Sequence, residues 1–163
     1  MNRGAITVDQ IVVSVSGTFK TEHVFSTTQQ VLGKMALNAA KSEGFFLGAD
    51  KSQLALKKAS FWKSVYELTQ EDQKIGTASS KGVFKRAFDI QFEDRSFELK
   101  PGGSKLRSWS VRNSQGVVVC EFLPRKSLKR GARIRINAEL PMSLIVLCYL
   151  LVIKRWQEES SAG

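Results

Sequence analysis

Few side chains in this sequence are suited to covalent or acid–base catalysis. His23 is the only histidine, and Cys120 and Cys148 are the only cysteines. A thiol and an imidazole held together can act as nucleophile and base, so Cys120 and His23 are one conceivable catalytic pair. The simpler interpretation is a surface histidine in a polar strand and two small, packed thiols. We therefore expect a protein that is not an enzyme and has no catalytic residues.

The carboxylates do not suggest an acid–base or metal site either. Glu71-Asp72 and Glu93-Asp94 fall on predicted turn tips, where water surrounds them. The sequence has no glycine-rich phosphate loop, and the run 101–104 is interpreted as a simple turn. We expect neither a metal ion nor a cofactor.

Basic side chains dominate the charge. The 163 residues include 25 Lys+Arg and 15 Asp+Glu, which gives a formal net charge of +10. A surface this positive attracts phosphates, whether they belong to lipid headgroups or to nucleic acid. The basic segments are Lys57-Lys58, Lys85-Arg86, Arg125-Lys126, Lys129-Arg130 and the pair Arg133 and Arg135.

The elements that must position these charges are short strands. In Phe88–Phe92 the apolar side chains take one face, and the same alternation runs through 97–100, 109–112 and 133–137. Turn-forming residues separate such runs at intervals of about 8–12 residues, which is typical of a sandwich or barrel. By the same alternation, Arg133 and Arg135 share one face of their strand.

The C-terminal segment breaks this pattern. Residues 142–153 carry no charge, and apolar side chains point in every direction around a helix drawn through them. Pro141 suits the start of a helix and Lys154-Arg155 suit its end, so we expect a helix over about 141–156. Twelve helical residues span about 18 Å, whereas the hydrocarbon core of a bilayer is about 30 Å thick. A helix buried in the protein is therefore preferred, with a short membrane anchor as the alternative.

Strands must then enclose this helix. A closed antiparallel barrel of about twelve strands is wide enough for a helix to fill it, and closure removes exposed sheet edges. The apolar stripe of each strand would face the helix, and the Lys/Arg stripe would face water. No linker divides the sequence, so we expect a single, mostly-β domain over residues 1–163, a closed and roughly 12-stranded antiparallel barrel around a hydrophobic C-terminal helix.

The successive hairpins, the run 60–68 followed by Ile75-Gly76, and the apolar C-terminal helix together resemble the tubby C-terminal superfamily. This superfamily includes phospholipid scramblases and LURP-one-related proteins, and the resemblance covers about residues 15–157. It implies a closed barrel around a C-terminal helix. It also implies phosphoinositide binding through basic residues just before the strand of Tyr66, which here are Lys57, Lys58 and Lys63.

Two features depart from the family pattern. The family's further basic contact follows the Ile-Gly pair, whereas residues 77–80 are uncharged here and Lys81 is the nearest cation. The carboxylate cluster expected near the end of a scramblase is also missing, because Glu139 and Glu158-Glu159 are too few for a calcium site that needs 6–8 oxygens.

Nucleic acid ranks below lipid as a partner. Proteins that bind single strands stack the bases on aromatic side chains that stand among the cations. Here four aromatic residues are in phase with the predicted core, and Phe61-Trp62 beside Lys63 is the place where we expect an aromatic side chain to be exposed near cations. The four core aromatics are Phe88, Phe92, Phe97 and Trp109.

The sequence thus predicts a monomeric, non-enzymatic module that binds anionic membrane lipid, such as a phosphoinositide, peripherally. The alternatives are a protein-interaction scaffold and nonspecific binding of RNA or DNA phosphates. The N-terminal residues do not read as a signal peptide, so we expect a cytoplasmic protein, including at membrane surfaces. The predicted binding residues are Lys57, Lys58, Lys63, Lys85, Arg86, Arg133 and Arg135.

Overall fold

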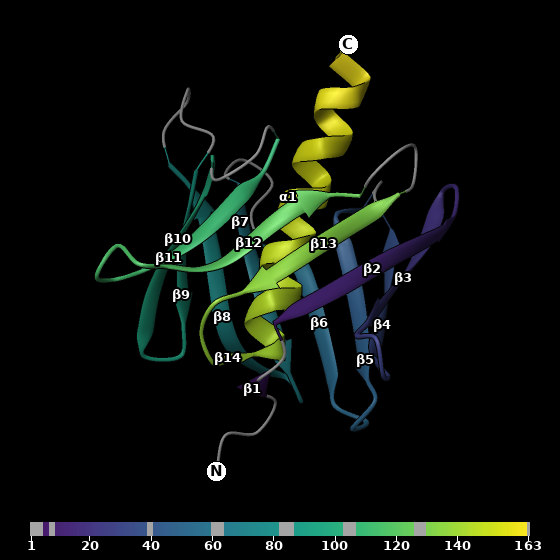
Figure 1. Cartoon of the computed structure of the whole chain (residues 1–163), viewed down its shortest axis with the longest axis horizontal. Helices are drawn as coiled ribbons and strands as arrows, with labels where there is room; N and C mark the ends of the chain where they lie inside the picture. The colour runs from purple at the N-terminus through teal and green to yellow at the C-terminus, as the bar shows by residue number, and fades with distance from the viewer. Residues whose placement is uncertain are drawn as a thin grey trace.

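Twelve antiparallel strands close into a barrel, and one long helix runs through it (Figure 1). The structure is a computed structural model that describes residues 5–6, 9–38, 41–59, 64–81, 87–102, 107–125 and 130–162. The strands are β1 (Ala5–Ile6), β2 (Gln10–Gly17), β3 (Lys20–Ser26), β4 (Val31–Asn38), β5 (Glu43–Gly48), β6 (Gln53–Lys58), β7 (Val65–Gln70), β8 (Gln73–Ser80), β9 (Phe88–Phe92), β10 (Arg95–Pro101), β11 (Trp109–Asn113), β12 (Val118–Pro124), β13 (Gly131–Ile136) and β14 (Leu140–Pro141), and the helix α1 is Met142–Ala162.

The barrel is a meander that closes on itself. Strands β2 to β13 pair in chain order, and β13 pairs with β2 to complete the ring. The two short strands β1 and β14 form a separate pair beside the start of α1 (Figure 1). The predicted fold, a closed 12-stranded antiparallel barrel with a C-terminal helix, is confirmed.

The alternation of the strands fills the barrel with apolar side chains. In β9, for example, Phe88, Ile90 and Phe92 are buried, whereas Asp89 and Gln91 are exposed. This is the expected behaviour of strands with one face toward a core and the other toward water. The apolar stripes therefore face α1, as the sequence predicted.

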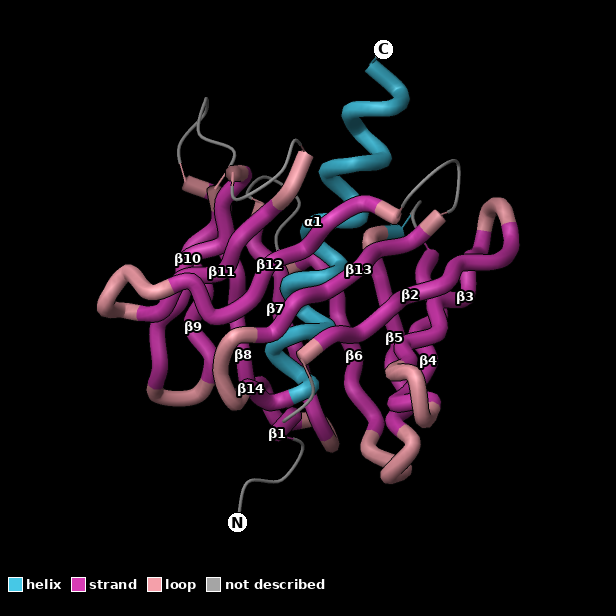
Figure 2. The backbone as a smooth tube through the Cα atoms, in the orientation of Figure 1, coloured by secondary structure: helices cyan, strands magenta, loops and turns pink. Residues whose placement is uncertain are grey.

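The first part of the helix lies among the strands, and its last turns project beyond them, as Figure 2 shows. Every residue from Leu144 to Val152 is at most 1% exposed, so this part of α1 has no solvent-facing side. Gly76 in β8 packs closely against the next strand, because a Cβ there would lie 3.2 Å from Phe92 Cδ2, and it is also within van der Waals reach of Leu147 on the helix. The apolar run is thus a core element. Within the described residues, no helix is long and apolar enough to cross a membrane.

The sequence predicted that the helix ends at its two basic residues, and this prediction is wrong. It continues past Lys154 and Arg155 to Ala162. The continuation is stabilised by an ion pair between Arg155 and Glu158, three residues apart on the helix surface, and by Trp156, whose Nε1 donates to the carbonyl of Arg107 at 3.0 Å. The basic residues therefore lie inside α1, at the level where it leaves the barrel.

The topology gives the barrel two distinct ends. We call the end where α1 emerges the helix-exit end, because Lys154 contacts Ser42 between β4 and β5 and Trp156 contacts Arg107 between β10 and β11. In an antiparallel ring, the connections that follow the even-numbered strands β2 to β12 all lie at this end. The others lie at what we call the turn end, where Glu71, Asp72 and Glu93 adopt positive φ in two tight hairpins.

Candidate anion-binding site at the barrel mouth

The two ends of the barrel carry opposite charge. Carboxylates gather at the turn end, with Lys51, Lys74, Arg95 and Arg112 among them: Asp9, Asp50, Glu71, Asp72, Glu93, Asp94 and Glu139. The described cations of the helix-exit end are Lys20, Lys41, Lys58, Lys81, Arg107, Arg125, Arg130, Lys154 and Arg155, against Glu43, Asp89, Glu98, Glu158 and Glu159. Anions are therefore attracted to the end where the helix emerges.

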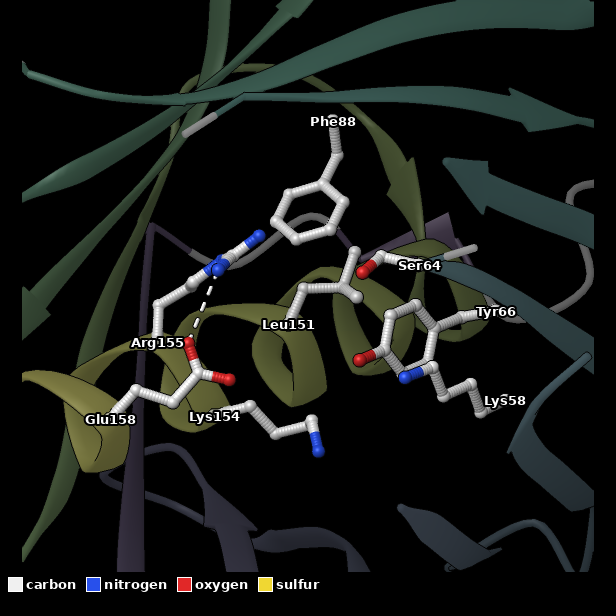
Figure 3. A pocket seen from close by; sticks show the side chains of 8 residues that line it. All are labelled: Lys58, Ser64, Tyr66, Phe88, Leu151, Lys154, Arg155 and Glu158. Atoms are coloured by element: carbon white, nitrogen blue, oxygen red, sulfur yellow. Dashed lines mark hydrogen bonds and ion pairs between the residues drawn. The ribbon is translucent and has the colours of Figure 1, made fainter. Parts of the chain in front are cut away.

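A pocket of about 100 Å³ opens at this end, between α1 and the wall of the barrel (Figure 3). Its floor is helical and its wall comes from the ends of β6, β7 and β9. The lining residues are Lys58, Ser64, Tyr66, Phe88, Leu151, Lys154, Arg155 and Glu158.

Lys154 is held at the edge of the barrel core. Its Nζ donates to Ser42 Oγ at 2.7 Å and lies 5.9 Å from the centroid of the Tyr66 ring. Burial lowers the pKa of Lys154, and the neighbouring cations Lys58 and Arg155 lower it further, while Glu158 opposes them. A bound anion would favour the charged form of this lysine.

Arg155 lies against the opposite wall of the pocket. Its guanidinium carbon is 4.9 Å from the centroid of the Phe88 ring, and its Nη1 is 3.1 Å from Glu158 Oε2 (Figure 3). An aromatic face on one side and a carboxylate on the other fix the orientation of the guanidinium. Glu158 thus occupies one part of the hydrogen-bonding fork that an external anion would use.

The pocket is positively charged and offers several donors. Lys58, Lys154 and Arg155 against Glu158 give a formal charge of 3 − 1 = +2. Burial raises the pKa of Tyr66, and Glu158 adds to this effect, so the phenol stays protonated and able to donate. Such a set of ammonium, guanidinium and hydroxyl donors is suited to the oxygens of a phosphate group.

The predicted residues Lys57 and Lys58 point in opposite directions, as neighbours in a strand must. Lys58 follows the inward phase of Leu54 and Leu56 and reaches the pocket. Lys57 points outward, and its cross-strand neighbours are two acids, Glu43 on β5 and Glu67 on β7. Of these two lysines, only Lys58 lines the pocket, which we call the mouth pocket.

Arg133 and Arg135 share the outer face of β13, as predicted, but they lie far from the pocket. Around the barrel, β13 is five strands from β6. Arg135 Nη1 is 3.3 Å from Oε1 of the buried Glu121, and the buried Arg133 Nε has no hydrogen-bond partner among the described residues. These arginines and Lys58 therefore do not form one patch.

Three other predicted residues, Lys63, Lys85 and Arg86, lie outside the described residues. Lys81, the nearest cation after the Ile-Gly pair, is engaged by two carboxylates: it bonds to Glu98 and lies 3.1 Å from Asp89. Its pKa is raised by these two partners. Lys81 is therefore engaged in ion pairs with β9 and β10 on the wall of the barrel.

Sequence reasoning missed Lys154 and Arg155 as site residues, because it placed them at the end of the helix. A signal was present: Arg155 and Glu158 stand three residues apart, the spacing of an ion pair on a continuing helix. The residues after Lys154-Arg155 could therefore have been included in the helix.

The prediction that His23 is a surface residue is wrong. It is fully buried inside the barrel, with Nε2 2.7 Å from Thr21 Oγ1 and Nδ1 2.6 Å from the hydroxyl of Tyr149 on α1. Cys120 and Cys148 are buried thiols, as expected, and burial raises the pKa of both. In the described part of the chain, no group of three or more His, Cys, Asp or Glu side chains is arranged to hold a metal ion.

Comparisons with known proteins bear on the fold. No family model and no curated protein matches the chain. An X-ray structure of a protein from Arabidopsis thaliana is similar, with a TM-score of 0.64 and 13% sequence identity over 97% of this chain and 96% of that one. At this identity the similarity concerns the architecture, a barrel that extends over nearly the whole of both chains.

Proposed function

We propose that this protein is a non-enzymatic module that binds anionic membrane lipid peripherally, with a phosphate-bearing headgroup at the mouth pocket. The observation that carries the proposal is the convergence of Lys58, Lys154 and Arg155 on one pocket that contains a single acid, Glu158. Kinship with the tubby-like superfamily is part of the proposal, and the closed barrel around a central helix supports it.

The surroundings of the pocket favour a membrane surface. The connections at the helix-exit end bring further cations, including Arg107, Arg125 and Arg130, to the same end of the molecule. Each Lys or Arg near an anionic membrane surface contributes about 1 kcal/mol to binding. Several together are enough for reversible recruitment of the protein.

The four aromatic residues of the predicted core are not available for recognition of single-stranded nucleic acid. Phe88, Phe92, Phe97 and Trp109 are all buried in the barrel core. None of these four is exposed for bases to stack on, which is how such proteins gain most of their base affinity. The experiment below tests binding through phosphates alone by competition with single-stranded RNA.

One observation favours a second function, as a protein-interaction scaffold. Phe45 and Leu47 on the outer face of β5 are 47% and 48% exposed, and Phe45 lies between Ala36 and Ala55 on the neighbouring strands. Apolar side chains gathered on an outer wall are typical of a protein contact. If the Phe45→Lys variant lost binding to a partner protein while its binding to vesicles was unchanged, this second function would be supported.

The test of the lipid proposal is flotation with vesicles. The native protein should float with vesicles that contain a phosphoinositide and not with neutral ones. Lys58→Glu should reduce the partition coefficient roughly 30-fold, since two units of charge change near the surface. Lys51→Glu, which makes the same change at the turn end, is the control and should bind as the native protein does.

The outcomes separate the candidates. Equal recovery with phosphoinositide and neutral vesicles would reject the lipid proposal. Excess single-stranded RNA that strips the protein from the vesicles would favour nucleic-acid binding. Equal losses in Lys58→Glu and Lys51→Glu would show that net charge, and not the pocket, determines binding.

A further inference from the structure

A single phenylalanine stands out at the helix-exit end. Phe19 is 91% exposed, at the tip of the hairpin between β2 and β3. Gly17 and Thr21 are paired across the hairpin, so residues 18–20 turn the chain. Gly17 has a φ of +92°, and a Cβ there would lie 2.4 Å from the carbonyl oxygen of Lys20. The turn therefore depends on glycine, and it holds the phenyl ring away from the barrel.

The neighbours of this tip are cations. Arg130 Nη1 donates to the carbonyl of Gly17 at 2.7 Å, and Arg125 Nη1 lies 3.3 Å from Ser14 Oγ on β2. Lys20 follows Phe19 directly, and Glu22 is the nearest acid along β3. The β2–β3 hairpin and the adjoining end of β12 and β13 thus form a shoulder of the barrel, which we define by Phe19, Lys20, Arg125 and Arg130 (Figure 1).

The other exposed apolar residues lack this setting. Phe45 and Leu47 lie on the outer wall of β5, and Val31 and Val117, 47% and 54% exposed, lie at the turn end. Isolated exposed apolar side chains are common and need no explanation. The combination of an aromatic tip with three cations is different, because it matches a surface that is anionic outside and apolar beneath.

We propose that Phe19 inserts into the interface of an anionic bilayer while Lys20, Arg125 and Arg130 contact its headgroups. This inference rests on the proposed lipid-binding function and adds the orientation of the protein on the membrane. The last turns of α1 project from the same end (Figure 1), and the mouth pocket opens there too, so the bilayer meets the barrel at its helix-exit end. The turn end faces away from the membrane.

Flotation tests the contribution of the ring. Phe19→Ser should reduce partitioning into phosphoinositide vesicles roughly tenfold, because the burial of one phenyl ring is lost. Val117→Ser removes an exposed apolar side chain at the turn end and should leave partitioning unchanged. Native protein that does not float at all would refute the proposed function and this inference together. Native protein and Phe19→Ser that float equally would refute the inference alone.

A fluorescent label tests the orientation directly. Cys120 and Cys148 are each 1% exposed, so a new surface cysteine can be labelled selectively with an environment-sensitive dye. The dye on Phe19→Cys should brighten several-fold and shift to shorter wavelength when anionic vesicles are added, whereas the dye on Val117→Cys should not respond. A change in the fluorescence of the dye at position 117 would overturn the proposed orientation. So would unchanged fluorescence at position 19 in protein that floats with the vesicles.

Discussion

His23 makes a buried polar contact between the barrel wall and the helix. It bonds to Thr21 within β3 and to the hydroxyl of Tyr149 on α1, and its ring meets the Tyr149 ring edge-on at 5.4 Å between centroids. A neutral imidazole donates from one nitrogen and accepts at the other, so both nitrogens are satisfied without a charge. This pairing is specific in a core where most other contacts are apolar, and it helps to define how the helix is seated.

The burial of His23 makes stability depend on pH. Burial, with a smaller effect of Arg130, lowers the pKa of His23 from its ordinary value of 6.5 to about 4. The unfolded chain therefore binds this proton at a higher pH than the folded protein does, and the free energy of unfolding decreases as the pH falls below 6.5. Between pH 7.5 and 4.5 the loss from this group should be about 2–3 kcal/mol. Urea unfolding at the two pH values measures it.

The control is His23→Gln, which keeps a polar side chain but does not titrate. Its loss of stability between the same pH values should be smaller than that of the native protein by about that amount. Equal losses in the two proteins would mean that other groups cause the pH dependence.

Glu158 should weaken anion binding, because it holds the guanidinium of Arg155 and lowers the charge of the mouth pocket. Glu158→Gln should raise the affinity for anionic vesicles about fivefold, the effect of one unit of charge near the surface. Glu159→Gln makes the same change in net charge, but Glu159 lies near Arg107, 3.9 Å away, and does not line the pocket. Vesicle titrations that give both variants the same affinity would contradict a role of Glu158 in the pocket.

At the scale of the element, α1 and the strands depend on each other. The helix has no polar face between Leu144 and Val152 and would be insoluble as an isolated segment, while the strands without it would enclose an empty, apolar space. Hydrophobic burial along the whole inner wall therefore stabilises helix and barrel together. A single destabilising substitution in the middle of α1 should therefore destabilise the entire molecule.

Leu147→Asp is the sharpest test of this dependence. Leu147 is fully buried, and an unpaired carboxylate at this position should cost several kcal/mol and unfold the protein. Circular dichroism and thermal unfolding measure the effect. Val117→Asp, at an exposed site, should leave the unfolding midpoint nearly unchanged. A folded and stable Leu147→Asp variant would contradict the enclosed helix.

At the scale of the whole molecule, the opposite charges of the two ends define an axis along the barrel. The tight hairpins of the turn end carry carboxylates, and the connections and helix residues of the helix-exit end carry cations. This arrangement orients the protein in the field of an anionic surface before contact is made. It also divides the proposed membrane contact into an electrostatic part and the apolar part contributed by Phe19.

The two parts should respond differently to salt. Raising the ionic strength from about 0.1 to 1 M shortens the Debye length from about 10 to about 3 Å, so partitioning into anionic vesicles should fall at least tenfold. The ratio of partition coefficients between native protein and Phe19→Ser should change little, because apolar burial is not screened. A ratio that falls as steeply as the binding itself would contradict an inserted ring. Flotation over a series of salt concentrations provides both values.

Much of the architecture could be predicted from local patterns. Alternation identified strands such as Phe88–Phe92, turn residues marked the hairpins at Glu71-Asp72 and Glu93-Asp94, and a helix that is apolar on every side required an enclosure. These features depend on neighbouring residues, whose periodicity is written in the chain. The same alternation places His23 in phase with the buried Phe25 and so predicts that it is buried, whereas the polar residues around it in the sequence favour a surface position.

The sequence by itself determined which side chains face the core and which face water, because a strand or helix repeats with a fixed period. Only the tertiary structure decided which cations meet. The antiparallel ring gathers the connections after even-numbered strands at one end, turns Lys58 inward and Lys57 outward where the strand ends, and brings Lys154 and Arg155 to the mouth. It separates Arg133 and Arg135 on β13 from Lys58 on β6 by five of the twelve strands. These distances depend on how the barrel closes, which is a property of the whole chain.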